Sequence, residues 1–198
     1  MQVFHSKVMV GLLVSGLLAL ATNVARADDP TGGTAYYQLK TTDYFKCLGL
    51  EHQSTNNGTQ MEEQACLPST GAQTQAWKWN PNDCINFANG GGYYTAYCTI
   101  RSPNNKCLGT YAGSANQGTY AVLWDCLGTA HTDQYWATSI GADGTMHISN
   151  YKARLANHGY GLGFVAETRE NGCTLDCIHD QVGLETSSYA MTATPVNP

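Results

Sequence analysis

The amino-acid sequence predicts an all-β protein made of repeated units, and three observations support this. No run of twelve or more residues places apolar side chains at helical spacing. Turn-forming clusters of Gly, Asn, Ser and Thr instead recur every eight to twelve residues, which is typical of short strands joined by tight turns. One pattern with a period of about sixty residues also occurs twice. We therefore expect one β domain with internal symmetry.

The repeated pattern has four parts in a fixed order. Lys-Cys-Leu-Gly comes first, then a Gly-Thr turn, a second cysteine and a closing Gln-x-Trp; the two copies are 46–49 with 106–109, 58–59 with 118–119, Cys66 with Cys126, and 75–77 with 134–136. Such a unit buries its apolar face only against neighbouring units. Because two units are too few to close a core, a third is expected between Gly144 and the C-terminus.

The strands and turns of the first two units follow from local composition. The predicted elements are a strand at 36–39, a turn at 43–45, a strand at 46–50, and tight turns at 56–58 and 116–118. Asn and Gly in those tight turns tolerate positive φ. Residues 82–98 are more than a connection needs and carry Cys84, Cys98 and three consecutive glycines. They predict a hairpin insertion closed by a disulfide.

The Gln and Trp of the closing motif leave a strand on the same face, because strand side chains alternate. A tryptophan buries about 150 to 250 Å² and anchors a core layer, while the Gln amide can satisfy backbone groups of a nearby loop. We predict that Trp77 and Trp136 pack in the core, and direct contact with a ligand is the alternative.

The third copy is degraded. Its first strand is predicted at 144–148, and Lys152-Ala153-Arg154-Leu155 stands where Lys-Cys-Leu is expected. Ser187-Ser188-Tyr189 takes the place of Gln-x-Trp, and the first cysteine is missing.

The N-terminus has the pattern of a secretory signal peptide. Lys7 precedes an apolar run at 8–20, and Ala25-Arg26-Ala27 offers small residues for cleavage after Ala27. The alternative is a membrane anchor, but thirteen helical residues cover only about 20 Å of a hydrocarbon core about 30 Å thick. We therefore predict a secreted protein without a transmembrane anchor.

Eight cysteines in an exported chain predict a disulfide framework. The repeat predicts pairing within each unit, Cys47 with Cys66 and Cys107 with Cys126. We pair the other four as neighbours in sequence, Cys84 with Cys98 and Cys173 with Cys177. A metal site at Cys173, Cys177 and His179 is the alternative, which an oxidising compartment and an even cysteine count disfavour.

Charge and motifs argue against several function classes. Ten Lys and Arg face fifteen Asp and Glu without a basic cluster, which disfavours nucleic acid and anionic membranes as partners. The histidines are scattered, no Gly-x-Ser-x-Gly is present, and the adjacent Glu62 and Glu63 would point to opposite faces of a strand. We therefore predict a binding module without a metal or cofactor rather than an enzyme.

Paired cysteines after Lys, a Gly-Thr turn and Gln-x-Trp in each unit resemble the ricin B-type lectins. That family implies a β-trefoil, three four-stranded units around a pseudo-threefold axis, with a shallow sugar pocket in each unit. The domain is then expected at 28–198, with units at about 34–80, 99–138 and 144–193 and an insertion at about 82–98. A carbohydrate or glycoprotein ligand follows from the resemblance.

The resemblance also implies which residues bind the sugar. The family places an Asp two residues after the first cysteine, an aromatic residue two before the second cysteine, and polar residues at and just before the motif Gln. The matching residues are Trp124, Asp133 and Gln134 in the second unit, and Gln64, Thr74 and Gln75 in the first. A carboxylate accepts bonds from neighbouring hydroxyls, and an aromatic face stacks on the apolar face of a sugar ring.

The anchoring Asp itself is missing from this chain. Its position holds Gly49 in the first unit, Gly109 in the second and Ala156 in the predicted third. A charge-assisted hydrogen bond contributes about 1.5 to 3 kcal/mol, so we expect sugar binding weakened about ten- to a hundredfold. Some relatives, including binding subunits of cytolethal distending toxins, lack the pockets and engage cells through other surfaces. A toxin-like adhesion subunit with a partner protein, or another protein-binding trefoil such as a protease inhibitor, is therefore the alternative.

Overall fold

The computed structural model describes residues 35–89, 94–169 and 178–198, and within them the chain is almost entirely β. The strands are β1 Tyr36–Thr41, β2 Cys47–Leu50, β3 Met61–Gln64, β4 Ala76–Ala88, β5 Tyr94–Arg101, β6 Cys107–Thr110, β7 Ala121–Trp124, β8 Tyr135–Ile140, β9 Met146–Asn150, β10 Gly161–Arg169, β11 Ile178–Glu185 and β12 Met191–Val196. The short helical elements are η2 Glu51–Gln53, η3 Tyr111–Gly113, η4 Thr132–Gln134 and α1 Tyr151–Leu155.

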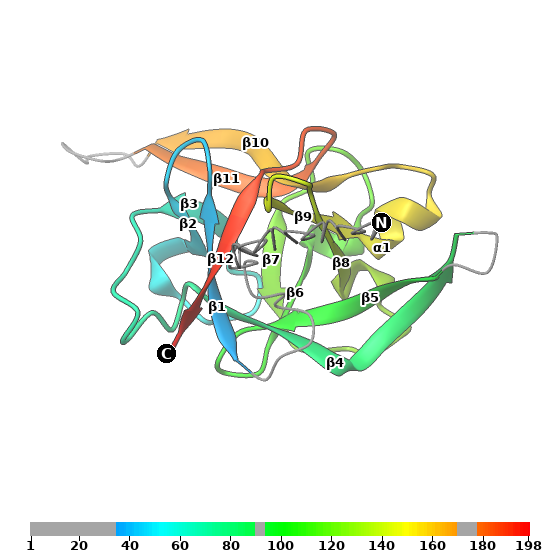
Figure 1. Cartoon of the computed structure of the whole chain (residues 1–198), viewed down its shortest axis with the longest axis horizontal. Helices are drawn as coiled ribbons and strands as arrows, with labels where there is room; N and C mark the ends of the chain where they lie inside the picture. The colour runs from blue at the N-terminus through cyan, green and yellow to red at the C-terminus, as the bar shows by residue number, and fades with distance from the viewer. Residues whose placement is uncertain (1–34, 90–93, 170–177) are drawn as a thin grey trace, which may run out of the picture.

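Six strands close into an antiparallel barrel (Figure 1). The ring runs β1, β4, β5, β8, β9, β12 and back to β1, each strand pairing with the next. The remaining strands form three hairpins, β2–β3, β6–β7 and β10–β11, one in each unit of four strands. This is the β-trefoil architecture, and the predicted all-β fold of three repeats is confirmed.

The hairpins meet one another at one end of the barrel. Gln60 bridges to Val122, Tyr120 bridges to Gly183, and β11 pairs with β3. The turns predicted to need positive φ lie at two of these junctions, where Gly58 has φ 86° and Gly118 has φ 79°. Each hairpin therefore closes its end of the barrel only together with its neighbours, as a repeat protein requires.

Equivalent positions of the three units build the core. The barrel layer contains Trp77, Trp136 and Met191, and the hairpin layer contains Leu48, Leu108 and Leu162, all with no exposed area. Trp77 Nε1 donates to Leu48 O at 2.9 Å, and Trp136 Nε1 donates to Leu108 O at 2.8 Å. The prediction that both tryptophans are core residues is confirmed.

Strand pairing corrects the predicted alignment of the third unit. In the first two units the first cysteine begins the hairpin and pairs with β1 or β5. In the third unit Gly161 takes this place, because it pairs with β9 in the same way. Residues 152–155, predicted for this place, belong to α1 instead. The anchor position moves with the register from Ala156 to Gly163. The cause is an insertion, because α1 and the loop after it lengthen the link between β9 and β10.

The closing motif of the third unit is also displaced from its predicted place at 187–189. Met191 pairs with β9 in the same register as Trp77 pairs with β1 and as Trp136 pairs with β5, so Met191 takes the Trp position. Tyr189 therefore stands at the Gln position and not at the Trp position. An unbranched thioether fills the space that an indole fills in the other units, which is the adaptable packing expected of methionine.

Three disulfides hold the described part of the chain: Cys47–Cys66, Cys84–Cys98 and Cys107–Cys126. They are the pairs expected for these six cysteines, and they indicate an oxidising compartment. The predicted Cys173–Cys177 pair, its metal alternative and the signal peptide all lie outside the described residues. Within the described residues, no helix is long and apolar enough to span a membrane.

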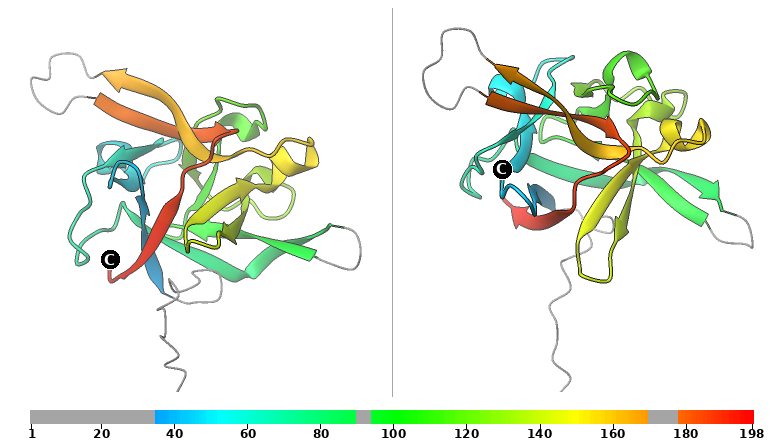
Figure 2. Two further views of the ribbon diagram at one scale, coloured as in Figure 1. Left: turned by 45° about the horizontal axis from the view of Figure 1, so that its top comes forward. Right: turned by 90° about the horizontal axis from the view of Figure 1, so that it is seen from above.

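Strands β4 and β5 continue past the barrel as a long hairpin. Their pairing runs from Cys84 with Cys98 out to Ala88 with Tyr94, and the hairpin extends on the side of the molecule opposite β10 and β11 (Figure 2). A network of polar side chains fixes its base. Asp83 accepts hydrogen bonds from Arg101 Nη2 at 2.7 Å and from Tyr135 Oη at 2.7 Å.

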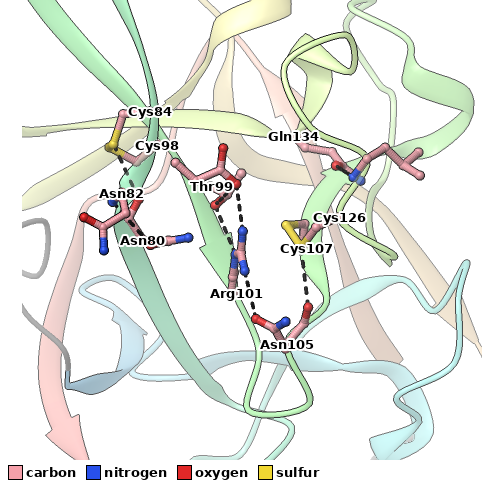
Figure 3. A network of polar contacts seen from close by, with 12 residues as sticks. Asn80, Asn82, Cys84, Cys98, Thr99, Arg101, Asn105, Cys107, Cys126 and Gln134 are labelled. Atoms are coloured by element: carbon pink, nitrogen blue, oxygen red, sulfur yellow. Dashed lines mark hydrogen bonds and ion pairs between the residues drawn. A yellow bond between two sulfur atoms is a disulfide. The ribbon is translucent and has the colours of Figure 1, made fainter.

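Arg101 connects this base to the loop before β6. Its guanidinium donates to Thr99 Oγ1 at 3.3 Å and to Asn105 Oδ1 at 2.9 Å, and Figure 3 shows these contacts between the two neighbouring disulfides. Burial raises the pKa of Asp83, but the hydrogen bonds from Tyr135, Arg101 and Thr99 together outweigh it and hold that pKa below its usual value. Burial and the bond to Asp83 raise the pKa of Tyr135 to about 12.

Candidate functional site

In the second unit a carboxylate lies next to Gly109, the position at which the resemblance implies an anchoring Asp. Asp133 belongs to η4, and a Cβ atom added at Gly109 would lie 3.2 Å from its Oδ2. A Cβ atom added at Gly113 would lie 3.4 Å from its Oδ1. The same Cβ would lie 3.1 Å from Gln134 Cγ, so Asp133 and Gln134 together border the space next to Gly109. A carboxylate oxygen from η4 therefore lies next to a position that has no side-chain acceptor of its own.

The surroundings of Asp133 hold it in place. Its side chain is 9% exposed, and His131 Nδ1 lies 3.9 Å from Oδ1. Asn150, the N-cap residue of α1, donates from Nδ2 to Asp133 O at 2.8 Å and accepts from the Ala153 backbone N–H at 3.1 Å. The helix inserted into the third unit therefore braces the candidate site of the second.

Trp124 presents an open aromatic surface at the end of β7. The residue is 41% exposed. Because side chains alternate, it leaves the strand on the same face as Val122, the residue that pairs with Gly109. One ring edge is near the turn of the first unit, since a Cβ added at Gly58 would lie 3.4 Å from Cζ3. An exposed indole and a held carboxylate therefore share one face of the β6–β7 hairpin.

The two motif glutamines have a structural role. Gln134 Oε1 accepts from the Leu127 N–H at 2.9 Å, and Nε2 donates to Asp125 O at 2.8 Å. Gln75 uses all its amide capacity within the chain: it accepts from Leu67 N and Gln38 Nε2 and donates to Ala65 O and Gln64 Oε1. Both amides tie down the loop after the second cysteine. Gln134 keeps a place in the candidate site through its position next to Asp133.

The corresponding place in the first unit is filled by its own side chains. Gln64 folds over Gly49, where an added Cβ would lie 2.5 Å from Gln64 Oε1. Gln64 Nε2 also donates to Leu50 O at 2.8 Å and to Glu62 Oε1 at 2.5 Å. Thr74, which stands where the second unit has Asp133, is 7% exposed. At the places of Trp124 and Asp133 the first unit therefore has neither an open aromatic ring nor a carboxylate.

The third unit is closed by backbone. A Cβ added at Gly163 would lie 2.6 Å from Ser187 O, so this position has no room for a side chain. Ser188, which stands where the second unit has Asp133, has Oγ 3.1 Å from His147 Nδ1. Of the three equivalent places, the second unit alone combines an acidic side chain with an exposed aromatic one among the described residues.

Three residues of this site escaped the sequence analysis: Gly113, His131 and Asn150. The signal for Asn150 was present, because Asn is a preferred N-cap, but no helix was expected at that place. Gly113 and His131 carry no local signal, since only the folded chain brings them next to Asp133.

Comparisons with known proteins identify the fold. No model of a protein family matches the chain, and no curated protein sequence matches it. Similar solved structures include ThreeFoil, a designed 3-fold symmetric protein, at 19% identity and TM-score 0.54, with 82% of this chain and 99% of that one covered. The agglutinin of Abrus precatorius is 22% identical with TM-score 0.51, over 82% of this chain and 48% of that one.

A chain of the cytolethal distending toxin from Actinobacillus actinomycetemcomitans is also similar. It is 12% identical with TM-score 0.51, over 83% of this chain and 92% of that one. This chain thus spans about half of the agglutinin chain but most of ThreeFoil and of the toxin chain. At these identities the likeness shows a shared β-trefoil fold and leaves function to the site.

Proposed function

We propose that this protein is a secreted carbohydrate-binding module with one sugar site, in its second unit. The observation that carries the proposal is the carboxylate of Asp133, which stands in the space beside Gly109 on the same face as the exposed ring of Trp124. A carboxylate and an aromatic face are the two groups that a galactose-type sugar needs, for its hydroxyls and its apolar face respectively.

The proposed site is weak. Asp133 is largely covered, with a side chain 9% exposed, so a sugar reaches it less easily than it would reach an exposed carboxylate. Stacking on one tryptophan and one charge-assisted acceptor correspond to a binding free energy of about −4 to −6 kcal/mol, in the high micromolar to millimolar range. A glycoprotein that presents several sugars would bind more tightly through multivalency.

Titration of the oxidised protein with galactose and methyl galactosides, followed by NMR, tests this site. Trp124→Ala and Asp133→Asn should each weaken binding about tenfold or more, because they remove the stacking surface and the acceptor. The matched control is Thr74→Ala in the first unit, which should leave binding unchanged. Loss of binding in the control, with binding retained in Asp133→Asn, would contradict the assignment.

A protein-binding role is the second candidate, and exposed apolar side chains favour it. Tyr44 is 61% exposed and Phe45 is 70% exposed, both at the turn between β1 and β2. A chain of a toxin has the same fold, so binding to a partner subunit is included in this alternative. This role would be supported if the protein still bound cells whose glycans had been completely removed. Phe45→Ser, but not Trp124→Ala, should then abolish that binding.

Secretion after cleavage behind Ala27 remains part of the proposal. The disulfides support it, because they form in oxidising compartments. N-terminal sequencing of protein recovered from the culture medium should begin at Asp28.

A further inference from the structure

A cavity lies away from the candidate site of the second unit. It has a volume of about 360 Å³ and opens between the β4–β5 hairpin, the β8–β9 strands and the segment around α1. Its lining includes Asn89, Tyr97, Arg154, His158 and Tyr160. This volume is within the range of small-ligand sites. The segment that forms one wall is the insertion of the third unit, so the cavity has no counterpart in the other units.

One cation stands at this cavity. Arg154 is exposed, and its guanidinium carbon lies 5.3 Å from the ring centroid of Phe87. Among the described residues, no carboxylate forms an ion pair with it. In a chain of net charge −5, an arginine that is oriented by an aromatic ring and has no acidic partner in the described part of the chain is available to an anionic ligand.

An aromatic layer supports this arginine from below. The Phe87 ring packs edge to face on Tyr97 and on Tyr151, with centroid distances of 6.4 Å and 6.1 Å. The centroids of Tyr97 and Tyr151 are 4.9 Å apart. Burial raises the pKa of Tyr97, whose hydroxyl also hydrogen-bonds with Ser149. Of these three rings, Tyr97 lines the cavity itself, and Phe87 and Tyr151 pack behind it.

A flat π-surface forms another part of the lining. The rings of His158 and Tyr160 stack at 4.7 Å with an angle of 11° between their planes. Each ring covers one face of the other, so a pyranose can stack its apolar side only on an outer face of the pair. Asn89, Thr95 and Ser149 add polar groups to the lining. Asn89 Nδ2 donates to Thr95 Oγ1 at 2.6 Å and Ser149 Oγ donates to Ala137 O at 3.5 Å, so the Thr95 O–H and Asn89 Oδ1 are the groups offered to sugar hydroxyls.

We propose that this cavity binds an acidic sugar of the uronic acid type, whose carboxylate pairs with Arg154 and whose ring lies against an outer face of the stacked His158–Tyr160 pair. A guanidinium pairs with a carboxylate through two parallel hydrogen bonds, which a neutral sugar cannot replace. The hydroxyl-bearing and aromatic lining favours a sugar over a simple organic acid. This site is independent of Asp133 and would stand if the galactose site failed.

Isothermal titration of the oxidised full chain with galacturonic acid and with its methyl ester tests the proposal. The acid should bind about tenfold or more tightly than the ester, because the ester keeps the ring but loses the charge. Arg154→Gln should remove this difference. The matched control is Lys78→Gln, since Lys78 also lies over an aromatic ring, 4.8 Å from the centroid of Tyr36, but does not line the cavity.

The inference would be overturned by equal binding of acid and ester, by unchanged binding in Arg154→Gln, or by tighter binding of galactose 6-sulfate than of galacturonic acid. Asp133→Asn separates the two sites. It should abolish binding of neutral galactose and leave galacturonic acid unaffected, and loss of both ligands would place them in one site and refute the second. Arg154 is exposed, so its substitution is not expected to unfold the protein.

Discussion

The first and second units share a fold but differ at two equivalent positions of the candidate site, Gln64 against Trp124 and Thr74 against Asp133. Both have glycine where the lectin family has its anchoring Asp, at Gly49 and Gly109. The first unit covers that glycine with Gln64, whereas the second leaves Trp124 exposed and places the Asp133 carboxylate there. The comparison shows that a unit without Asp at the position of Gly109 can still have a carboxylate next to that position, from another residue.

The largest expected effect tests the shared frame. Trp77→Ala and Trp136→Ala should each lower the free energy of unfolding by about 3 to 5 kcal/mol, because each removes a fully buried indole and leaves a cavity. Chemical denaturation followed by fluorescence measures both. Equivalent packing predicts costs that agree within about 1.5 kcal/mol, and a wider gap would break the equivalence of the two units.

The next effect tests the displaced carboxylate. Gly109→Asp should destabilise the protein by about 1 to 3 kcal/mol and fail to improve galactose binding, because the new Cβ would lie 3.2 Å from Asp133 Oδ2 and add a like charge. The double variant Gly109→Asp with Asp133→Asn should recover both stability and binding. Improved binding in the single variant would show that Asp133 does not occupy the anchor space.

A graft sharpens the comparison further. Gln64→Trp with Thr74→Asp copies the second-unit residues into the first, so two equivalent sugar sites should result. NMR titration should show perturbations at both hairpins with affinities within about tenfold of each other. The matched variant with Gln64→Ala and Thr74→Ala opens the place without supplying either group and should add no site.

The smallest effect concerns pH. The pKa of Asp83 is lowered in the folded protein, so its contribution to stability is fully present above its unfolded value of about 3.9 and is lost as the pH falls through the folded pKa. Asp83→Asn should therefore cost about 1 to 2 kcal/mol at neutral pH and less near pH 3. Denaturation at the two pH values measures this.

The first unit supplies the control for that prediction. Lys40 is the first-unit counterpart of Arg101, since the two pair with Cys47 and Cys107. Among the described residues, no Asp forms an ion pair with Lys40 as Asp83 does with Arg101, and Ala76 stands where the second unit has Tyr135. Lys40→Gln should therefore change stability equally at both pH values, and a cost confined to neutral pH would contradict the assignment of the acid-sensitive network to the second unit alone.

The sequence by itself determined the repeat, the strand-rich fold and the partners of six cysteines. A period of sixty residues with matched Cys and Trp positions requires equivalent environments, and this needs no tertiary information. Core positions were predictable for the same reason, because an alternating strand shows which side chains share a face.

Only the tertiary structure decided the third unit and the state of the sugar sites. α1 shifts the register there, so that Gly161 and Met191 take the places predicted for 152–155 and Tyr189. No local pattern marks such a shift, since Gly and Met carry neither the cysteine nor the indole of the motif. The carboxylate beside Gly109 comes from Asp133, twenty-four residues further along the chain. Spacing along a strand cannot report that proximity, because the turn of η4 and the hydrogen bond from Asn150 set it in three dimensions.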